Sequence, residues 1–120
     1  SFVMISSVSA TETQNAQAYG AIKAAMIHYA KGLAKECAKA KVRVNVVSPG
    51  TIYFKGGVWH NIEQGAPQMF DATIKRNPTG RMGTPQEIAN AAVFLSSPVS
   101  SFTTGANLIV DGAITSRVNY

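Results

Sequence analysis

The stretch VRVNVVSPG, residues 42–50, decides the fold predicted for this chain. Four of its first six residues are valine, a nearly continuous apolar run typical of strands that are covered on both faces. Ser48-Pro49-Gly50 then ends the run, because proline cannot donate to a ladder and glycine permits a tight turn. An earlier apolar run, FVMI over residues 2–5, predicts a second strand of the same kind. The two runs therefore indicate neighbouring strands of a parallel sheet.

The segment between these two runs has a helical pattern. Its apolar residues recur three or four positions apart, and this spacing predicts a helix over about residues 16–40 with one buried stripe. The stripe consists of Ile22, Met26, Ala30, Leu33 and Cys37. Strand, helix and strand in this order predict an α/β fold. Ser7 and Pro49-Gly50 then follow carboxyl ends of parallel strands, at the edge where open α/β sheets bind ligands.

Size and composition exclude several classes of protein. The 120 residues, 46% of them apolar, suit one domain with a real core. No apolar run approaches the ~20 residues that span a bilayer, and no signal peptide is evident, so we expect a cytoplasmic protein. Cys37 is the single cysteine, which excludes an internal disulfide, and we expect a buried thiol there. His28 and His60 are too isolated to indicate a metal site, and none is expected.

The net charge is +5, and part of the positive charge lies on one side of the predicted helix. Lysines recur there at Lys31, Lys35 and Lys39, with Lys41 just beyond. A nucleic-acid or membrane surface would interleave aromatic residues or gather the charge further. We therefore interpret the stripe as a solvated face, with no nucleic-acid or membrane partner.

Tyr19 and Lys23 form the candidate catalytic pair. A spacing of four places both on one helix face, where the Lys23 ammonium can favour the phenolate of Tyr19. Such a phenol can exchange a proton with a carbonyl or alcohol oxygen, and Ser7, twelve residues before Tyr19, can hold that oxygen. The pair alone is weak evidence. The alternative is a half-buried aromatic residue beside a surface cation.

The second half of the chain begins with an irregular segment, residues 51–78. It carries several glycines and aromatic residues and predicts a mobile lid with short helices near 58–64 and 68–75. The alternative is a surface excursion whose aromatic residues pack down. Next, TPQE over residues 84–87 predicts a capping box that opens a helix ending near Ser96. Residues 105–110 then lead into a last strand.

Five motifs in sequence order carry a family resemblance. They are ISSVS (5–9), YGAIK (19–23), NVVSPG (45–50), GRMGTPQEIA (80–89) and GANLIVDG (105–112). Together they closely resemble the C-terminal half of the short-chain dehydrogenase/reductase family. The resemblance implies a Rossmann-like, doubly wound parallel sheet. It makes residues 1–120 the C-terminal catalytic half of one NAD(P)-binding domain, with the substrate loop at about 51–78. The family's N-terminal Gly-rich cofactor motif is absent, which suggests a fragment of a longer chain.

The resemblance also assigns roles to individual residues. It implies Tyr19 as the general acid/base, Ser7 as the residue that orients the reacting oxygen, and Lys23 as a ligand of the nicotinamide ribose. It implies a cofactor, NAD or NADP, and it places backbone near the nicotinamide carboxamide just after the Pro-Gly turn. The cofactor-binding residues are then Tyr19, Lys23, Pro49, Gly50, Thr51 and Ile52. Where family members often have a cofactor-touching threonine, this chain has Tyr53-Phe54-Lys55.

The choice of serine stays open at this point. The family's usual spacing of thirteen selects Ser6, whereas the motif order selects Ser7 and requires a one-residue deletion in the loop at 11–16. We prefer Ser7, with Ser6 as the alternative and Ser9 behind it.

The expected function is hydride transfer between a nicotinamide and a small carbonyl or alcohol substrate, in a homodimer or homotetramer. The main alternative is a non-catalytic relative that keeps the fold for assembly or regulation. A basic nucleic-acid-binding module is more distant.

Overall fold

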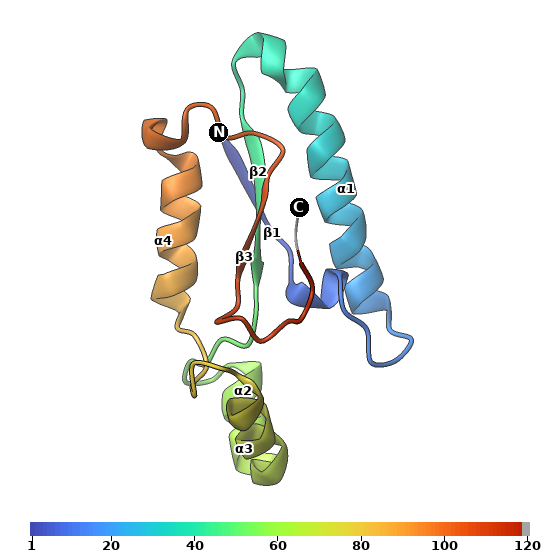
Figure 1. Cartoon of the computed structure of the whole chain (residues 1–120), viewed down its shortest axis with the longest axis vertical. Coiled ribbons are helices and arrows are strands. Elements are labelled where there is room, and N and C mark those ends of the chain that lie inside the picture. Colours follow the sequence, from blue (N-terminus) through green and yellow to red (C-terminus); the bar gives the residue numbers. More distant parts are fainter. Residues whose placement is uncertain (119–120) are drawn as a thin grey trace.

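The computed structural model describes residues 1–118 and has, within them, three parallel strands between helices on both sides (Figure 1). The strands are β1 (Phe2–Ile5), β2 (Val44–Pro49) and β3 (Asn107–Val110), in the order β1-β2-β3. The α-helices are α1 (Ala18–Cys37), α2 (Val58–Gly65), α3 (Pro67–Arg76) and α4 (Pro85–Ser96). Short 3-10 helices are η1 (Val8–Ala10), η2 (Ala38–Ala40) and η3 (Pro98–Ser100). The predicted α/β class with a parallel sheet is confirmed.

Strand β2 forms the centre of the core, as its valines predict. It pairs with β1 on one side and with β3 on the other. Val44 and Val46 are buried and cluster with two alanines of α1, Ala30 and Ala34. Because alanine is small, the helix backbone approaches the sheet closely there. Helix α4 lies across the sheet from α1 and buries Leu95 (Figure 1).

The predicted apolar stripe of α1 is wrong at its N-terminal end. Ile22 is 62% exposed, and the buried positions of the helix are Gly20, Ala30 and Ala34. The helix is buried against β2 at its small residues Ala30 and Ala34, with Ile27 and Leu33 packed beside them, and Ile22 lies outside this cluster. Cys37 is half-buried, less covered than expected.

Both ends of the first strand–helix–strand unit differ slightly from the prediction. Helix α1 begins two residues later than expected, and its last turn tightens into η2 before Lys41 adopts a left-handed conformation with φ of 59°. Strand β2 also continues through Pro49, which pairs with Val110. The ladder survives the proline because Gly50 donates its N–H to the Val110 carbonyl at 2.9 Å. A side chain at Gly50 would lie 2.7 Å from the Asp111 Cβ, so this close approach requires glycine.

Helix α4 is fixed at both ends by polar contacts. Thr84 and Glu87 form the predicted capping box at its start. At its end, the guanidinium of Arg43 donates to the carbonyl oxygens of Leu95, Ser96 and Ser97 at 2.6, 3.2 and 3.0 Å. These are carbonyls that a helix C-terminus leaves without intrahelical partners. Arg43 therefore attaches α4 to the start of β2.

A buried amide joins β2 to the segment before β3. Asn45 is fully buried, and its side chain donates to the Thr103 carbonyl at 2.8 Å and accepts the Ala106 N–H at 3.0 Å. Both of its polar ends thus have partners, as buried polar groups require.

The predicted lysine stripe lies on the surface. Lys31, Lys35 and Lys39 are all exposed. Within residues 1–118, no helix has the length and apolar character that crossing a bilayer requires.

Candidate active site

The carboxyl ends of β1 and β2 bring the first group of predicted site residues to one edge of the sheet. Ser6 directly follows β1, and its N–H donates to the Val47 carbonyl of β2 at 2.8 Å. Thr51 and Ile52 follow β2 at the same edge. Figure 1 shows η1, α2 and α3 at this end of the sheet. The sequence therefore places both motifs correctly relative to the strands.

Lys23 is tied to the end of β1 by two hydrogen bonds. Its Nζ donates to the Ile5 carbonyl at 2.8 Å. Its own backbone carbonyl accepts the hydroxyl of Ser6, also at 2.8 Å. Together these bonds fix the second turn of α1 against the strand end, and they set the position of every site residue on that helix.

Tyr19 lies one helical turn before Lys23 on α1. The Lys23 Nζ is 5.7 Å from the centre of the Tyr19 ring, within the range of a cation–π interaction. The ring is 54% exposed, so its hydroxyl is accessible to a bound molecule. The structure thus brings the phenol and the ammonium together, as the spacing of four predicts.

The two serines after β1 have different partners. Ser6 is buried, and its hydroxyl hydrogen is used by the Lys23 carbonyl. Ser7 is the N-cap of η1, and its oxygen accepts the Ser9 N–H at 3.1 Å. Because Ser7 acts there as an acceptor, its own O–H is left to donate elsewhere. This difference favours Ser7 over Ser6 as the serine that holds a substrate oxygen, and the assignment stays a prediction.

The backbone N–H and C=O of Ile52, just after β2, take no part in the hydrogen bonds to Gly83. Ile52 forms a parallel β-bridge with Gly83, but the hydrogen bonds of this bridge are made by Thr51 and Tyr53. The Thr51 carbonyl accepts the Gly83 N–H, and the Tyr53 N–H donates to the Gly83 carbonyl, both at 2.9 Å. In this pattern the N–H and C=O of Ile52 point away from Gly83. They form an adjacent donor and acceptor of the kind that a carboxamide can bind.

Thr51 also carries a buried hydroxyl oxygen that has no hydrogen-bond partner within residues 1–118. It borders a small cavity of about 90 Å³. Polar side chains from the loop after α3 and from the end of β3, including Asn77 and Asp111, also line this cavity. A buried hydroxyl without a partner is uncommon, because it loses its hydration without compensation. The sequence motifs indicate only a backbone role for this part of the chain and carry no signal for the Thr51 side chain.

The predicted lid, residues 51–78, contains α2 and α3, and the two helices predicted within it are confirmed. The lid is held together from within: the Tyr53 hydroxyl donates to the Glu63 carboxylate, and the Tyr53 ring contacts Phe70 edge-on at 5.8 Å. The hydrogen bond to Glu63, with its negative charge, raises the pKa of Tyr53 above its ordinary value. The His60 Nδ1 accepts the Gly56 N–H at 3.2 Å. That the lid covers a substrate stays a prediction.

Hydrogen bonds of polar side chains hold the segment that follows α3, where the chain leaves the lid. Asn77 is buried; its oxygen accepts the N–H and hydroxyl of Thr79, and its amide donates to the Asp111 carbonyl. Farther on, Arg81 and Glu87 form an ion pair at 2.6 Å. The hydrogen bonds from Arg81, and then those from Thr84, lower the pKa of Glu87 to about 2.

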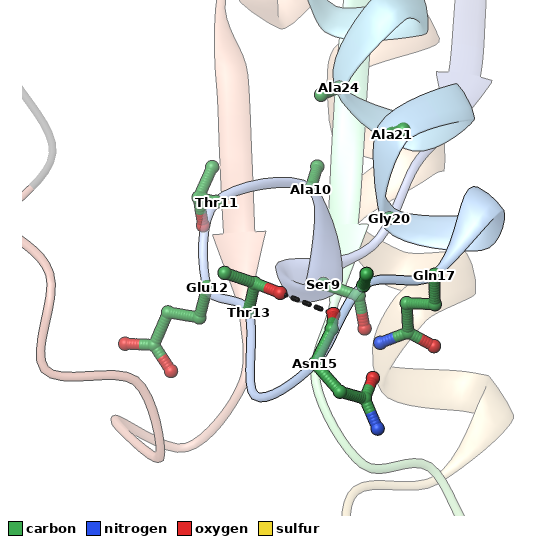
Figure 2. A pocket seen from close by; sticks show the side chains of 11 residues that line it. Ser9, Ala10, Thr11, Glu12, Thr13, Asn15, Gln17, Gly20, Ala21 and Ala24 are labelled. Atoms are coloured by element: carbon green, nitrogen blue, oxygen red, sulfur yellow. Dashed lines mark hydrogen bonds between the residues drawn. The ribbon is translucent and has the colours of Figure 1, made fainter.

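A larger cavity of about 310 Å³ lies beside η1 and the loop that leads to α1 (Figure 2). Its floor includes Gly20, Ala21 and Ala24 of α1, and the loop closes on itself where the Thr13 hydroxyl donates to the Asn15 carbonyl at 2.7 Å. Tyr19 and Lys23 do not line this cavity. Over the part of the chain that the structure describes, no group of three or more His, Cys, Asp or Glu side chains could hold a metal ion.

Comparisons with known proteins indicate the family of this chain. A family model described as enoyl-(acyl carrier protein) reductase matches residues 1–115. Isoepoxydon dehydrogenase of Aspergillus clavatus is 42% identical over 97 residues, which are 81% of this chain and 38% of the relative. The NADH-dependent L-xylulose reductase of Ambrosiozyma monospora is 41% identical over 97% of this chain and 43% of its own length. The chain thus spans less than half of these relatives.

Solved structures extend the likeness to three dimensions. A short-chain dehydrogenase/reductase family oxidoreductase from Burkholderia thailandensis superimposes with a TM-score of 0.85 at 40% identity, over 93% of this chain and 43% of that one. A 4-hydroxyisoleucine dehydrogenase in complex with NADH gives a TM-score of 0.82 at 33% identity, over 97% and 47%. Sequence motifs, fold and relatives agree, and this chain belongs to the short-chain dehydrogenase/reductase family.

Proposed function

We propose that this chain is the catalytic half of an NAD- or NADP-dependent oxidoreductase that interconverts a small carbonyl compound and its alcohol. In this proposal, residues 1–120 are the C-terminal half of one Rossmann-like domain, and residues 51–78 form its substrate loop. The relatives support it, since they are named dehydrogenases or reductases and the chain corresponds to less than half of each.

The observation that carries the proposal is the attachment of Lys23 to the end of β1. The bond from its Nζ to the Ile5 carbonyl uses one ammonium hydrogen and leaves two for other acceptors. It also holds the ammonium near the Tyr19 ring and on the sheet edge that Ser7 occupies. Lys31 on the solvated face also donates to a backbone carbonyl, that of Gly105, so the feature that distinguishes Lys23 is its position beside Tyr19 and the end of β1.

The chemistry follows from what each side chain can do. Ser7 donates its free O–H to the substrate oxygen and fixes its direction. Tyr19 gives its phenolic proton to that oxygen during reduction and takes it back during oxidation. Lys23 stabilises the negative charge that remains on the Tyr19 oxygen after the proton has left. The lid then excludes water from the bound substrate.

The donors and acceptors at this edge fit a nicotinamide dinucleotide. The N–H and C=O of Ile52, which do not bond to Gly83, complement a carboxamide, and the spare hydrogens of Lys23 suit ribose hydroxyls. The Thr51 hydroxyl oxygen has no partner among residues 1–118 and is available to the cofactor. Pro49 and Gly50 hold this backbone at the end of β2. When bound, the nicotinamide supplies or accepts the hydride.

The test is a direct assay of the intact protein with NADH and with NADPH. Substrates begin with ketoses and the corresponding polyols, because two similar proteins are an L-xylulose reductase and a D-arabinitol dehydrogenase. We expect oxidation of the reduced cofactor that depends on the substrate, and at least a tenfold loss in Ser7→Ala. A protein that binds neither cofactor, or that turns over no carbonyl compound, would support the non-catalytic alternative instead.

The Ser6→Ala variant provides the matched control for this assay. We expect it to lower stability, because it removes a buried hydrogen bond, while it leaves the proton-transfer step intact. If only Ser6→Ala abolished turnover, the assignment of Ser7 would be wrong.

We further propose that the protein works as a homodimer or homotetramer. Large apolar side chains are exposed on two separate faces: Ile22 and Tyr29 on α1, and Val93, Phe94 and Phe102 on α4 and after η3. Patches of this kind are uncommon on monomers. Light scattering after size exclusion tests the proposal, and a monomer at micromolar concentration would contradict it.

A further inference from the structure

Gly20 has a close neighbour that leaves no room for a side chain. It follows Tyr19 in the first turn of α1 and is buried there against η1. A Cβ at this position would lie 2.5 Å from the Ser9 carbonyl oxygen and 3.4 Å from the Ser9 carbonyl carbon. Both atoms are backbone, so they cannot rotate away as a side chain could. Figure 2 shows the same arrangement, with Ser9 next to the helix turn that carries Gly20.

The residue that contacts Gly20 also holds the candidate catalytic serine. The N–H of Ser9 donates to the Ser7 hydroxyl oxygen at 3.1 Å. This bond fixes the Ser7 oxygen as an acceptor and leaves its O–H to donate elsewhere. Gly20, the backbone of Ser9 and the hydroxyl of Ser7 therefore form one continuous series of contacts.

We propose that Gly20 is a positioning residue for the reaction: its lack of a side chain lets η1 rest on α1 and sets the Ser7 hydroxyl relative to Tyr19. This inference rests on the proposed function, because it assumes that Ser7 and Tyr19 act on one substrate oxygen. Gly20 itself touches neither substrate nor cofactor.

The anchoring of α1 determines which element would move if a side chain were added. The helix is bound to β1 by the Lys23–Ile5 and Ser6–Lys23 hydrogen bonds. By contrast, η1 continues into an exposed loop over residues 12–17. A methyl group at position 20 would therefore push η1 outward, and Ser7 would shift with it. A displacement on the order of 1 Å in such a site can cost roughly 100-fold in rate.

The same helix offers a matched control. Gly32 also lies inside α1, but a Cβ there would meet no atom within 4 Å. Gly32→Ala thus adds the same methyl group and the same gain in helix propensity without a contact. Any difference between Gly20→Ala and Gly32→Ala arises from the packing against Ser9.

The experiment compares both variants in the intact protein with the best substrate of the panel above. We expect Gly20→Ala to lower kcat at least tenfold while the Kd for NADH changes less than threefold, and Gly32→Ala to leave both unchanged. A double-mutant cycle with Ser7→Ala supplies a second readout. If Gly20 acts through Ser7, adding Gly20→Ala to Ser7→Ala costs less than a further twofold.

A third variant keeps the experiment decisive if Gly20→Ala by itself does not fold. One glycine inserted after Thr13 lengthens the exposed loop and lets η1 move away from α1 without strain on β1. In this background, we expect Gly20→Ala to fold and to remain slower than the insertion alone.

Two results would overturn the inference alone: full activity of Gly20→Ala while Ser7→Ala is impaired, or additive losses in the cycle. An unimpaired Ser7→Ala would instead overturn the assignment of Ser7 in the proposed function.

Discussion

The edge of the sheet and the lid, which lie at the same end of the molecule, are held in opposite ways. At the sheet edge, Lys23 and Ser6 bond to backbone of the neighbouring element, so strand and helix fix one another. In the lid, Tyr53 bonds to Glu63 and packs on Phe70, all within the segment between Thr51 and Gly83. Proton transfer needs groups at fixed positions, whereas substrate entry needs a cover that moves as a unit. The two patterns of contact are those that the proposed proton transfer and the proposed substrate cover require.

The largest expected effect comes from removing the phenolic proton of Tyr19 at the sheet edge. Tyr19→Phe keeps the ring near Lys23 but loses the hydroxyl, so we expect kcat to fall by roughly 10²–10⁴. The Kd for NADH, measured by fluorescence titration, should stay within about twofold. A Tyr19→Phe variant that keeps more than a tenth of the wild-type activity would contradict the contrast between the two regions, because the sheet edge would then not be the site of proton transfer.

Lys23→Met tests the anchor itself. We expect kcat/KM to fall roughly 10- to 100-fold, because one ammonium serves the cofactor and the Tyr19 phenolate at once. Weaker NADH binding and a displaced alkaline limb of the pH–rate profile should appear together. An unchanged affinity and pH profile would show that the bond to Ile5 is only structural.

Arg43→Met tests whether a contact that holds α4 to the sheet affects stability without affecting catalysis. The variant leaves three carbonyls at the end of α4 without the guanidinium. We expect the free energy of unfolding in urea to fall by about 2 kcal/mol, the scale of hydrogen bonds to a charged donor. The KM for substrate should not change. A selective rise in KM would mean that α4 and the lid are coupled, and the contrast between the two regions would be weaker.

Tyr53→Phe probes the lid with the ring contacts kept. It removes only the bond to Glu63, and we expect KM for the substrate to rise roughly two- to fivefold with little change in kcat. Glu63→Ala, which also removes the acceptor of this bond, should behave in the same way. If Tyr53→Phe lowered kcat as strongly as Tyr19→Phe, the lid would carry chemistry and the comparison would fail.

The smallest expected effect concerns pH and the Arg81–Glu87 pair at the lid exit. The pKa of Glu87 is lowered to about 2, so its contribution to stability is complete above its ordinary value near 4.5 and disappears as the pH falls toward 2. The pair is exposed, so the contribution is small. Glu87→Gln should lower Tm slightly at pH 7 and flatten the dependence of Tm on pH between 4.5 and 2. Equal slopes in both proteins would contradict this.

Much of the fold could be predicted because local patterns specify it. The valines of residues 42–47, the capping box at Thr84 and the spacing of Tyr19 and Lys23 each depend on neighbouring residues. The anchors could not be predicted in the same way. Arg43, Asn45 and Ser6 find their partners between 17 and 61 residues away, and no periodicity encodes such pairs. The exposure of Ile22 was missed because the stripe follows apolar character, whereas the helix packs through its small residues.

Gly20 illustrates the same limit at the site. A glycine after Tyr19 is compatible with any helix face, and its reason becomes visible only when the Ser9 carbonyl is placed beside it. The sequence signal that could have found it is the cost of glycine in a helix interior, which calls for a packing explanation.

The bridge between Ile52 and Gly83 has a consequence for how such an enzyme diversifies. It closes the chain on itself at the base of the lid, so the thirty residues between the two bridge partners form a cassette whose ends are already joined. Changes in α2 and α3 leave β2 and α4 in place as long as Asn77 and Arg81 are kept, because these two residues tie the segment to Asp111 and to Glu87 of α4. If the segment covers the substrate as proposed, selection for a new substrate, in nature or in a library, has these two helices to act on while the proposed proton-transfer residues keep their positions.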